Sequence, residues 1–573
     1  MTTSTQTHFS RLMLAMLALI AVVSLFDLGY RKLANPDEGR YSVIAQQMAT
    51  TGDFVTPRLN GLKYFEKPPM QYWAAAISFK LFGESEWSAR LYTSLCALLC
   101  LCLVGYTASR VFNREVGLYS VLALAACPYF MALGEIVTLD MGLTFWTTLS
   151  LCSFIISQSP RGGRDEHPGW VWLAWAAAAG AVLSKGLIGV LFPAATVFLY
   201  SVITRDISLI KKLGSRTWLI GIAIFFVLVT PWFILVGERN PEFYRFFFIH
   251  EHFERFLTKT HRREAPWWTF IAILMAGAAP WAFMLAQSIW RGFNLRGNGE
   301  ADFYHLANKA VPFSPLKFAL IWCGFIMVFF SMSGSKLPAY ILPIFPPLAI
   351  VIGYYLTTTP AKCLAKYLWP IPLLAIAGGV WAYLAPEQKA HDALTLALYK
   401  QYSVILVGAC SIIFVGSVAA IFMFMKDTEK LKRGAAVSVT LASLALIHLV
   451  NYGYEMISPL QSGYNAAQAA LKHLTPQTRF YGVKMYDQSM PFYTKRHMHL
   501  VQYVDEFETG QKAEPRLYTP KLESFAALWA QPGPAVAVMQ DGIYNDLTAE
   551  GVPMKLIHSD PRRYVVIKPP HLP

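Results

Sequence analysis

The sequence predicts a polytopic α-helical membrane protein with a small α/β domain at its C-terminus. Its 573 residues are 55% hydrophobic and only 15% charged, whereas a soluble domain carries about 25% charged residues. The mean hydropathy is +0.39, and many separate apolar runs reach the roughly 17–25 residues that cross a bilayer. Together these observations exclude an ordinary soluble globule.

Thirteen apolar runs are expected to be transmembrane helices. The first carries Arg11 in its flank but lacks a small-residue cleavage site, so we interpret it as an uncleaved span rather than a signal peptide. The stretch 70–82 is too short to span and is expected at the interface or against the bundle. The thirteen predicted spans are residues 9–29, 86–108, 115–133, 140–157, 169–184, 186–203, 216–237, 267–290, 314–332, 337–357, 367–385, 402–425 and 434–453.

The basic residues set the orientation of these spans. With the N-terminus in the cytoplasm, every inner loop is basic, from Arg110 in the first to Lys432 in the last. This topology places the long loops 30–85 and 238–266, and the C-terminus, on the outer side. Because topology accounts for much of the net charge of +14, the charge is poor evidence for nucleic-acid binding, and no nucleic-acid partner is expected.

Two domains are expected, a membrane domain over residues 1–454 and an outer α/β domain over residues 455–573. The outer domain has no Gly-rich phosphate loop, so no nucleotide cofactor is expected. Its apolar periodicity predicts a helix at 464–474 and strands at 479–486, 535–540 and 562–568.

The candidate catalytic residues begin in "NPDEGRY" (35–41). Asn35-Pro36 can open a helix whose first turn holds Asp37 and Glu38, where the helix dipole favours carboxylates. Apolar residues recur at helical spacing up to Met48, which predicts an amphipathic helix on the outer membrane surface. Simple capping of helix amides is the alternative to catalysis for these two acids.

Cations interleaved with aromatic residues follow in the same outer loop. Arg58, Lys63 and Lys67 surround Tyr64, although outer loops normally have few basic residues. Their retention there indicates an anionic ligand at the outer surface. Nonspecific binding to anionic lipid headgroups is the alternative.

Three further charged residues are expected at the same surface. Asp140 lies at the outer end of the fourth span, on the side predicted for Asp37. Lys185 and Lys336 each lie in a very short outer hairpin flanked by small residues, which would allow a ligand to approach closely. The alternatives are a solvated acid and snorkelling lysines at span ends.

A second candidate cluster lies in "HEHFERF" (250–256). His250 and His252 are two residues apart and, with a carboxylate such as Glu66, can bind a divalent metal ion, zinc or magnesium. Recognition of phosphate by Arg255 and its basic neighbours is an equally good explanation of the same segment.

The stretch "DEGRYSVIAQQMATTGDFVTPRLNGLKYFEKPPMQYW" resembles the first periplasmic loop of bacterial lipid A aminoarabinose transferases. These are integral membrane glycosyltransferases of the GT-C class. "LSKGLIG", "HEHFERF" and "SGSKLPAYILPIFPPLA" are similar to further segments of that family in the same order. The resemblance covers about residues 10–455 and implies a GT-C-like fold.

The resemblance also implies a reaction at the periplasmic face of the bacterial inner membrane. The donor would be 4-amino-4-deoxy-L-arabinose on undecaprenyl phosphate, and the acceptor a phosphate of lipid A, with inversion at the anomeric carbon. Such a reaction gives resistance to polymyxin and other cationic peptides.

Roles for the candidate residues follow from the implied chemistry. A lipid phosphate is already a good leaving group and needs cations rather than an acid. Lys67 is the first candidate because it lies in the most specific motif, and Tyr64 lines the same loop. An ionised acceptor phosphate hardly needs a base. Asp37 would therefore orient the acceptor, pair with the ammonium of the sugar or stabilise an oxocarbenium-like transition state, and Asp140 could share this role.

Two other functions are compatible with the sequence. One is a polyprenyl-phosphate-dependent glycosyltransferase that moves another sugar to protein or glycan, as O-mannosyltransferases do. The other is a lipid-linked sugar transporter, which should place its ionisable residues near the bilayer midplane. The notable charges here lie in loops or at span ends, which favours an enzyme.

Overall fold

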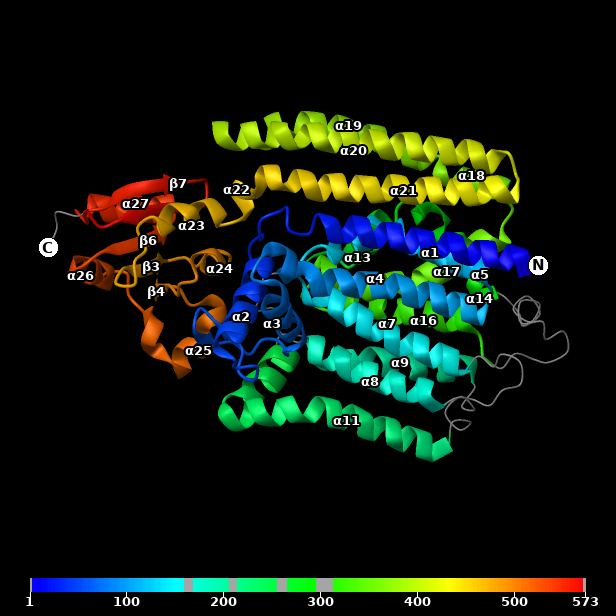
Figure 1. Ribbon diagram of the computed structural model, residues 1–573, viewed down its shortest axis with the longest axis horizontal. Helices are drawn as coiled ribbons and strands as arrows, with labels where there is room; N and C mark the ends of the chain where they lie inside the picture. The colour runs from blue at the N-terminus through cyan, green and yellow to red at the C-terminus, as the bar shows by residue number, and fades with distance from the viewer. Residues whose placement is uncertain (1–2, 159–167, 206–213, 255–264, 295–312, 570–573) are drawn as a thin grey trace. The chain divides into compact units, whose positions relative to one another are not determined.

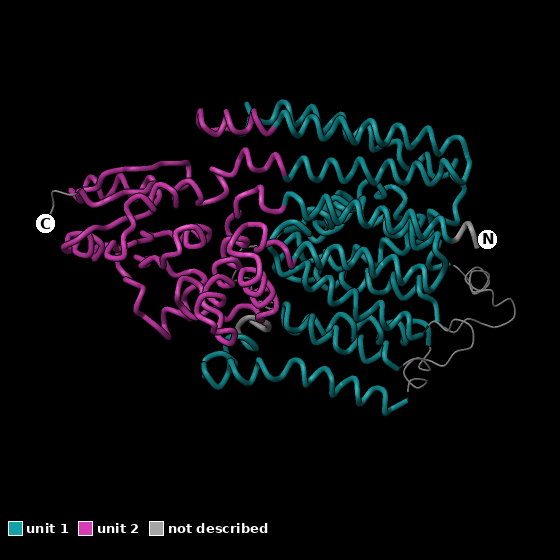
Figure 2. The backbone as a smooth tube through the Cα atoms, in the orientation of Figure 1, with its two compact units in different colours: residues 1–27, 93–389, 403–451 teal, residues 28–92, 390–402, 452–573 magenta. Residues whose placement is uncertain are grey.

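The computed structural model describes residues 3–158, 168–205, 214–254, 265–294 and 313–569 (Figure 1). It divides into two compact units, drawn in two colours in Figure 2. Unit 1 comprises residues 1–27, 93–389 and 403–451, and unit 2 comprises residues 28–92, 390–402 and 452–573. Unit 2 thus combines the first outer loop with the C-terminal residues, whereas the predicted membrane domain, residues 1–454, includes that loop.

Unit 1 is helical, and its long helices run alongside one another (Figure 1). The helices α4, α20 and α21 have most of their residues in this unit. The helices are α1 (Thr3–Phe26), α4 (Glu86–Val111), α5 (Arg114–Ala125), α6 (Pro128–Gly134), α7 (Leu139–Gln158), α8 (Pro168–Lys185), α9 (Ile188–Thr204), α11 (Gly214–Arg239), η1 (Arg245–Glu254), α13 (Thr269–Gly277), η2 (Ala282–Met284), α14 (Leu285–Asn294), α16 (Pro315–Met332), η3 (Pro338–Ile344), α17 (Phe345–Thr358), α18 (Ala361–Leu368), α19 (Pro370–Lys389), α20 (Ala393–Met425) and α21 (Glu429–Tyr454).

The helices confirm a polytopic membrane protein. Among the described residues, nine helices are long and apolar enough to cross a membrane, or up to eleven if each bent pair is one span. The bent pairs are α5 with α6, at 72°, and α13 with α14, at 115°. The helices α8 and α9 occupy the two remaining predicted runs. Every predicted run therefore coincides with a helix or a bent pair, while the number of thirteen crossings stays a prediction.

The bend between α5 and α6 has a local cause. Pro128, the first residue of α6, has no amide hydrogen to continue the hydrogen bonds of α5. Carbonyl groups near the end of α5 also accept side-chain hydrogen bonds, from Thr440 of α21 to Leu122 at 3.1 Å and from Trp281 to Ala123 at 3.1 Å. The bond from Thr440 holds α21 beside α5 within unit 1.

Unit 2 contains a six-stranded sheet in the order β5-β4-β3-β6-β8-β7. The strands β5, β4, β3 and β6 are parallel, and β8 and β7 are antiparallel additions at one edge. The small α/β domain predicted at the C-terminus is therefore present, and β3, β6 and β8 fall on the three predicted strands. The strands are β3 (Arg479–Val483), β4 (His499–Val501), β5 (Tyr518–Thr519), β6 (Ala535–Met539), β7 (Lys555–Ser559) and β8 (Tyr564–Ile567).

Short helices surround this sheet. The predicted helix at 464–474 is present as α23 (Tyr464–Leu471). A buried cluster that includes Trp529, Phe525 and Val566 forms the core between the helices and the sheet. The other helices of the C-terminal part are η4 (Glu455–Ile457), α22 (Ser458–Gln461), α24 (Met490–Thr494), η5 (Asp505–Phe507), α25 (Glu508–Ala513), η6 (Pro515–Leu517), α26 (Ser524–Ala530) and α27 (Asp541–Ala549).

The first outer loop folds into two helices and a hairpin, all within unit 2. The helix α2 (Asp37–Thr51) begins at the predicted residue and packs on α3 (Met70–Phe82), with the rings of Tyr41 and Tyr72 at 5.9 Å. Between them lies the hairpin of β1 (Arg58–Leu59) and β2 (Leu62–Lys63). Its turn residues Asn60 and Gly61 have φ values of 51° and 78°, the left-handed conformation that Asn-Gly supplies in tight hairpins.

The hairpin and α2 are both attached to the C-terminal part of unit 2. The amide of Asn60 donates to the carbonyl of Met498 at 2.8 Å and accepts from its backbone amide at 2.7 Å. A methyl group on Gly39 of α2 would lie 2.6 Å from backbone atoms of Gln488 and Ser489. The absence of a side chain at Gly39 therefore permits the close approach of the two segments.

Candidate functional site

Asp37 is the most accessible acidic group at the start of α2. Its side chain is 46% exposed, and its carboxylate accepts a hydrogen bond from Arg40 at 3.3 Å. Arg40 also reaches Glu506 of the C-terminal part at 3.4 Å. Asp37 thus combines exposure with a helix N-terminus and a neighbouring guanidinium.

Glu38, its neighbour, lies in a different environment. Its side chain is only 2% exposed and pairs with Arg31 at 2.9 Å and with Arg90 at 2.8 Å. The backbone amide of Ala34 donates to the same carboxylate at 2.9 Å. Burial by itself would raise the pKa of Glu38, but the charges of Arg31 and Arg90 and these hydrogen bonds hold the pKa well below its usual value. The geometry favours a positioning role for Glu38 over contact with a substrate.

The start of α2 has a second anchor, in the C-terminal part of unit 2. Asn35 donates to Asp487 at 2.8 Å, and its side-chain oxygen accepts from the amide of Ser489 at 2.9 Å. Asp487 also accepts from the buried Arg563, which pairs with Asp560 at 2.9 Å. The residues on both sides of Pro36 are therefore held by buried charged groups, and Asp37 lies within this anchored segment.

The predicted cations of the first outer loop occupy three different environments. Arg58 pairs with Glu514 at 2.7 Å, so part of its charge is already neutralised within unit 2. Lys63 lies opposite Arg58 in the hairpin and is half-buried. Lys67 is half-buried and donates to the carbonyl of Glu66 at 2.8 Å. Lys63 and Lys67 are thus two half-buried lysines that the same loop carries close together in the sequence.

Tyr64 lies between these cations and is 2% exposed. Burial raises the pKa of its phenol well above the usual value, so the ring stays neutral. The side chain therefore acts as a packed support for the strand that carries Lys63, and its neutral hydroxyl is a hydrogen-bonding group rather than a charge.

In unit 1 the structure brings together two of the predicted site residues. Lys185, at the end of α8, forms an ion pair with Asp140 in the first turn of α7. The Lys185 ammonium also lies over the ring of Tyr340, 4.6 Å from its centroid. The other hairpin lysine, Lys336, donates to the carbonyl of Ser333 at 2.8 Å. Asp140 is thus a carboxylate that orients a lysine.

The predicted metal ligands are only partly within the described structure. His250 and His252 belong to η1, but their side chains lie outside the described residues, and Arg255 lies outside them altogether. Glu66 is half-buried in unit 2. A divalent ion held by these groups therefore stays a prediction.

Arg31 and Arg90 are the site residues that sequence reasoning missed. The sequence does contain a signal for a buried ion pair, because Arg90 lies inside a predicted apolar span. An arginine there is costly unless it has a partner. Its partner is Glu38, fifty-two positions earlier in the chain, and periodicity within one segment cannot reveal a pair so far apart.

A cavity of about 270 Å³ lies within unit 1. Apolar side chains of α7, α8, α9 and α11 form nearly all of its wall, including Phe154, Trp175, Pro193, Phe198 and Trp218. A hydrocarbon chain could fill such an apolar cavity. A sugar phosphate could not, because its charge would lose its hydration there without gaining a partner.

Two family models match the chain. The model described as aminoarabinose transferase C-terminal domain matches residues 466–568, which form most of the C-terminal part of unit 2. The model described as dolichyl-phosphate-mannose-protein mannosyltransferase matches residues 9–247. The second match covers the first outer loop and the helices up to η1.

Curated relatives carry consistent names. An undecaprenyl phosphate-alpha-4-amino-4-deoxy-L-arabinose arabinosyl transferase of Erwinia tasmaniensis is 28% identical over 79% of each chain. A protein of the same name from Pseudomonas fluorescens is 30% identical over 61% of this chain, and the match spans 60% of that relative.

Solved structures resemble the whole chain. ArnT from Cupriavidus metallidurans bound to undecaprenyl phosphate has a TM-score of 0.87 and 32% identity, and the match covers 99% of both chains. The archaeal oligosaccharyltransferase AglB from Archaeoglobus fulgidus has a TM-score of 0.50 at 12% identity, covering 92% of this chain and 69% of that one. The latter likeness concerns the fold alone.

Proposed function

The chain belongs to the family of undecaprenyl phosphate-aminoarabinose arabinosyl transferases. We therefore propose that it transfers 4-amino-4-deoxy-L-arabinose from undecaprenyl phosphate to a phosphate of lipid A. The observation that carries the proposal is the similarity to ArnT bound to undecaprenyl phosphate over 99% of both chains. Adding a cationic sugar lowers the negative charge of lipid A, which weakens the attraction of polymyxin and other cationic peptides.

The reaction takes place at the periplasmic face of the inner membrane in this proposal. The N-terminus lies in the cytoplasm, and unit 2 lies on the periplasmic side. The basic loops support this orientation, because cytoplasmic loops of membrane proteins carry the excess of lysine and arginine.

Lys63 and Lys67 stabilise the leaving phosphate in this mechanism. The bond between the anomeric carbon and the phosphate oxygen breaks, and negative charge grows on that oxygen. Preorganised cations around such an oxygen lower the barrier without proton transfer. Both lysines are half-buried in one loop, which supports their assignment. Arg58, Arg255, Lys185 and Lys336 are further candidates for phosphate contacts.

Asp37 faces the reacting sugar in the proposed mechanism. The acceptor phosphate is already ionised, so Asp37 has no proton to remove from it. A carboxylate in this position pairs with the sugar ammonium or stabilises positive charge as the anomeric carbon loses its leaving group. The half-exposed side chain at a rigid helix N-terminus supports this assignment. Asp140 contributes by orienting Lys185.

A divalent ion, zinc or magnesium, remains part of the proposal. Glu66 with His250 or His252 would hold it, and an ion there would add positive charge for a phosphate group. The half-buried position of Glu66 beside Lys67 supports this assignment. No nucleotide cofactor is needed, because the donor sugar arrives on a lipid.

Replacing Asp37 by asparagine tests the catalytic assignment. We expect Asp37→Asn to lower transfer by about 100-fold or more, because it removes one charge aimed at the reacting centre. Mass spectrometry of lipid A, from a strain whose only transferase is this chain, measures the added aminopentose. Asp546→Asn, an exposed acid of α27, is the matched control and should transfer normally.

The same spectra distinguish the competing functions. Unchanged modification by Asp37→Asn would refute its catalytic role. Lipid A that acquires no aminopentose from the unaltered chain would refute the proposed reaction. A different sugar on protein or glycan would then favour the mannosyltransferase-like alternative, which the family match over residues 9–247 keeps in view.

A further inference from the structure

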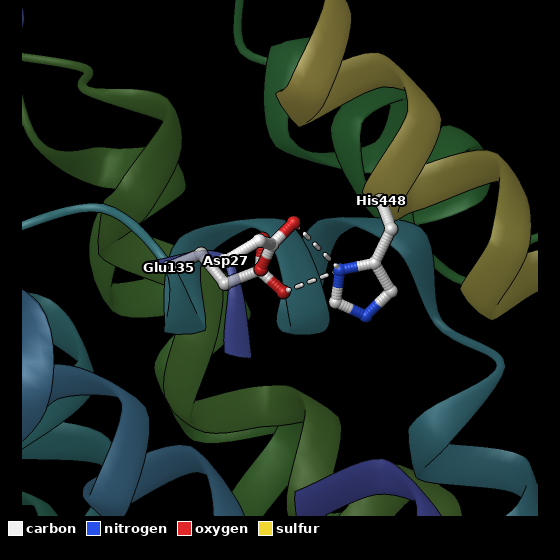
Figure 3. A group of neighbouring side chains, drawn as sticks. All are labelled: Asp27, Glu135 and His448. Atoms are coloured by element: carbon white, nitrogen blue, oxygen red, sulfur yellow. Dashed lines mark ion pairs between the residues drawn. The ribbon is translucent and has the colours of Figure 1, made fainter. Parts of the chain in front are cut away.

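Three ionisable side chains of unit 1 converge outside the residues assigned to the reaction (Figure 3). Nδ1 of His448 lies 3.2 Å from a carboxylate oxygen of Glu135 and 3.8 Å from one of Asp27. Figure 3 shows both carboxylates approaching the same ring nitrogen. One atom from each residue lies within 4.8 Å of the others.

The three side chains lie at or near the C-terminal ends of three separate helices. Asp27 directly follows α1, Glu135 directly follows the short α6, and His448 lies in the last part of α21. The hydrogen bond from Thr440 to Leu122 holds α21 beside α5 two turns before His448. The break at Pro128 then turns α6, so that Glu135 lies beside α21.

The side chains are enclosed and oriented. Glu135 is 6% exposed, His448 is 12% exposed and Asp27 is 26% exposed. The Asn451 amide donates to one oxygen of Glu135, and the other oxygen faces His448. Such an outer hydrogen bond is typical of a carboxylate that ligates a metal. Within the described part of the chain, neither ring nitrogen of His448 makes a hydrogen bond.

The spacing of the donor atoms fits a metal ion. Ligands about 2.1 Å from a tetrahedral zinc ion lie roughly 3.4 Å apart. The observed separations of 3.2 Å and 3.8 Å bracket that value. The charge also fits, since a divalent cation would balance two enclosed carboxylates while the imidazole stays neutral. An imidazole favours zinc over magnesium or calcium, which prefer oxygen ligands.

We propose that Asp27, Glu135 and His448 form a zinc-class divalent-cation site that ties the ends of α1, α6 and α21 together. Water completes the coordination. The site is distinct from the ion predicted at Glu66 and His252, and its role is to stabilise the helical unit rather than to take part in sugar transfer.

The experiment measures bound zinc in the purified full-length chain after chelation and reloading with zinc chloride. All variants carry His250→Ala and His252→Ala, so the other predicted site does not contribute. We expect His448→Gln and Asp27→Asn to bind about one zinc ion per chain fewer than this background. His473→Gln, an exposed histidine of unit 2, is the matched control and should bind as much zinc as the background.

A second measurement needs no substitution within the cluster. X-ray absorption of the zinc-loaded background protein should show nitrogen and oxygen ligands with one histidine, and zinc should raise the melting temperature. Equal zinc in the background and in both cluster variants would overturn the proposal, as would a background that takes up no zinc. Sugar transfer does not enter either measurement, so the result is independent of the proposed function.

Discussion

Glu38 and Asp37 are adjacent acids whose environments separate their roles. The carboxylate of Glu38 faces two arginines inside unit 2, and that of Asp37 is half-exposed. Two buried cations and one buried anion stabilise one another only as a complete set, because each isolated charge would be costly. The physical consequence is that Glu38 keeps the chain before α2 in place, while Asp37 stays half-exposed at the start of the helix.

Removing the charge of Glu38 should destabilise the protein. Glu38→Gln leaves Arg31 and Arg90 without their buried anion, so we expect a loss of about 3–5 kcal/mol in the free energy of unfolding. Denaturant unfolding of the detergent-solubilised protein measures it. Glu508→Gln removes an exposed i,i+4 pair with Lys512 and should cost about 0.5 kcal/mol or less. Equal effects of the two substitutions would refute the anchoring role.

The pH dependence of this contribution has a definite sign. The pKa of Glu38 is lower in the folded protein than its ordinary value of 4.5, so the folded state favours the charged form. Its stabilisation is therefore complete at neutral pH and declines only as the pH falls below about 4.5. Between pH 5 and pH 7 the difference in stability between Glu38→Gln and the unaltered chain should stay constant.

At the scale of elements, α2 is a helix positioned by close contact rather than by its own sequence. Its apolar residues pack on α3, and Gly39 allows the backbone of Gln488 and Ser489 to approach. The hairpin adds Asn60 and the Arg58–Glu514 pair as further attachments. The C-terminal part of unit 2 therefore acts as the support that sets the orientation of α2.

Adding one methyl group at Gly39 tests this support. A Cβ there would lie 2.6 Å from backbone atoms, which cannot move as a flexible side chain can, so α2 must shift. We expect Gly39→Ala to cost about 1–3 kcal/mol of stability and to lower aminopentose transfer in the lipid A assay. Gly542→Ala is the matched control, since its Cβ would meet nothing within 4 Å. Normal stability and transfer in Gly39→Ala would refute the tight contact.

At the scale of the whole molecule, the distribution of charge predicts the orientation in the membrane. The turn between α20 and α21 contains Lys426 and is followed by Lys430, Lys432 and Arg433. The positive-inside rule places this turn in the cytoplasm. The same rule predicts the polar C-terminal part on the opposite side, one crossing later.

Reporter fusions test that orientation. An alkaline phosphatase that folds only outside the cytoplasm should be active when fused after residue 569 and inactive when fused after Asp427. A reporter active only in the cytoplasm, fused at the same two positions, should give the reverse pattern. Activity of the alkaline phosphatase at Asp427 would refute the assigned topology.

The sequence alone was sufficient for the helical membrane fold, the start of α2, the helix α23 and three strands of the C-terminal sheet. These features depend on composition, hydropathy and apolar periodicity, all of which are encoded within short segments. The resemblance of the first outer loop to a transferase family was likewise readable there, because its motif is contiguous.

Only the tertiary structure decided which charged residues meet. Arg90 pairs with Glu38, Lys185 pairs with Asp140, and His448 joins two carboxylates from distant helices. Each carboxylate in the sequence has many possible cationic partners, and periodicity within a segment does not distinguish among them. Packing selects the partner, because a buried charge is stable only where the fold brings an opposite charge or a metal ion to it.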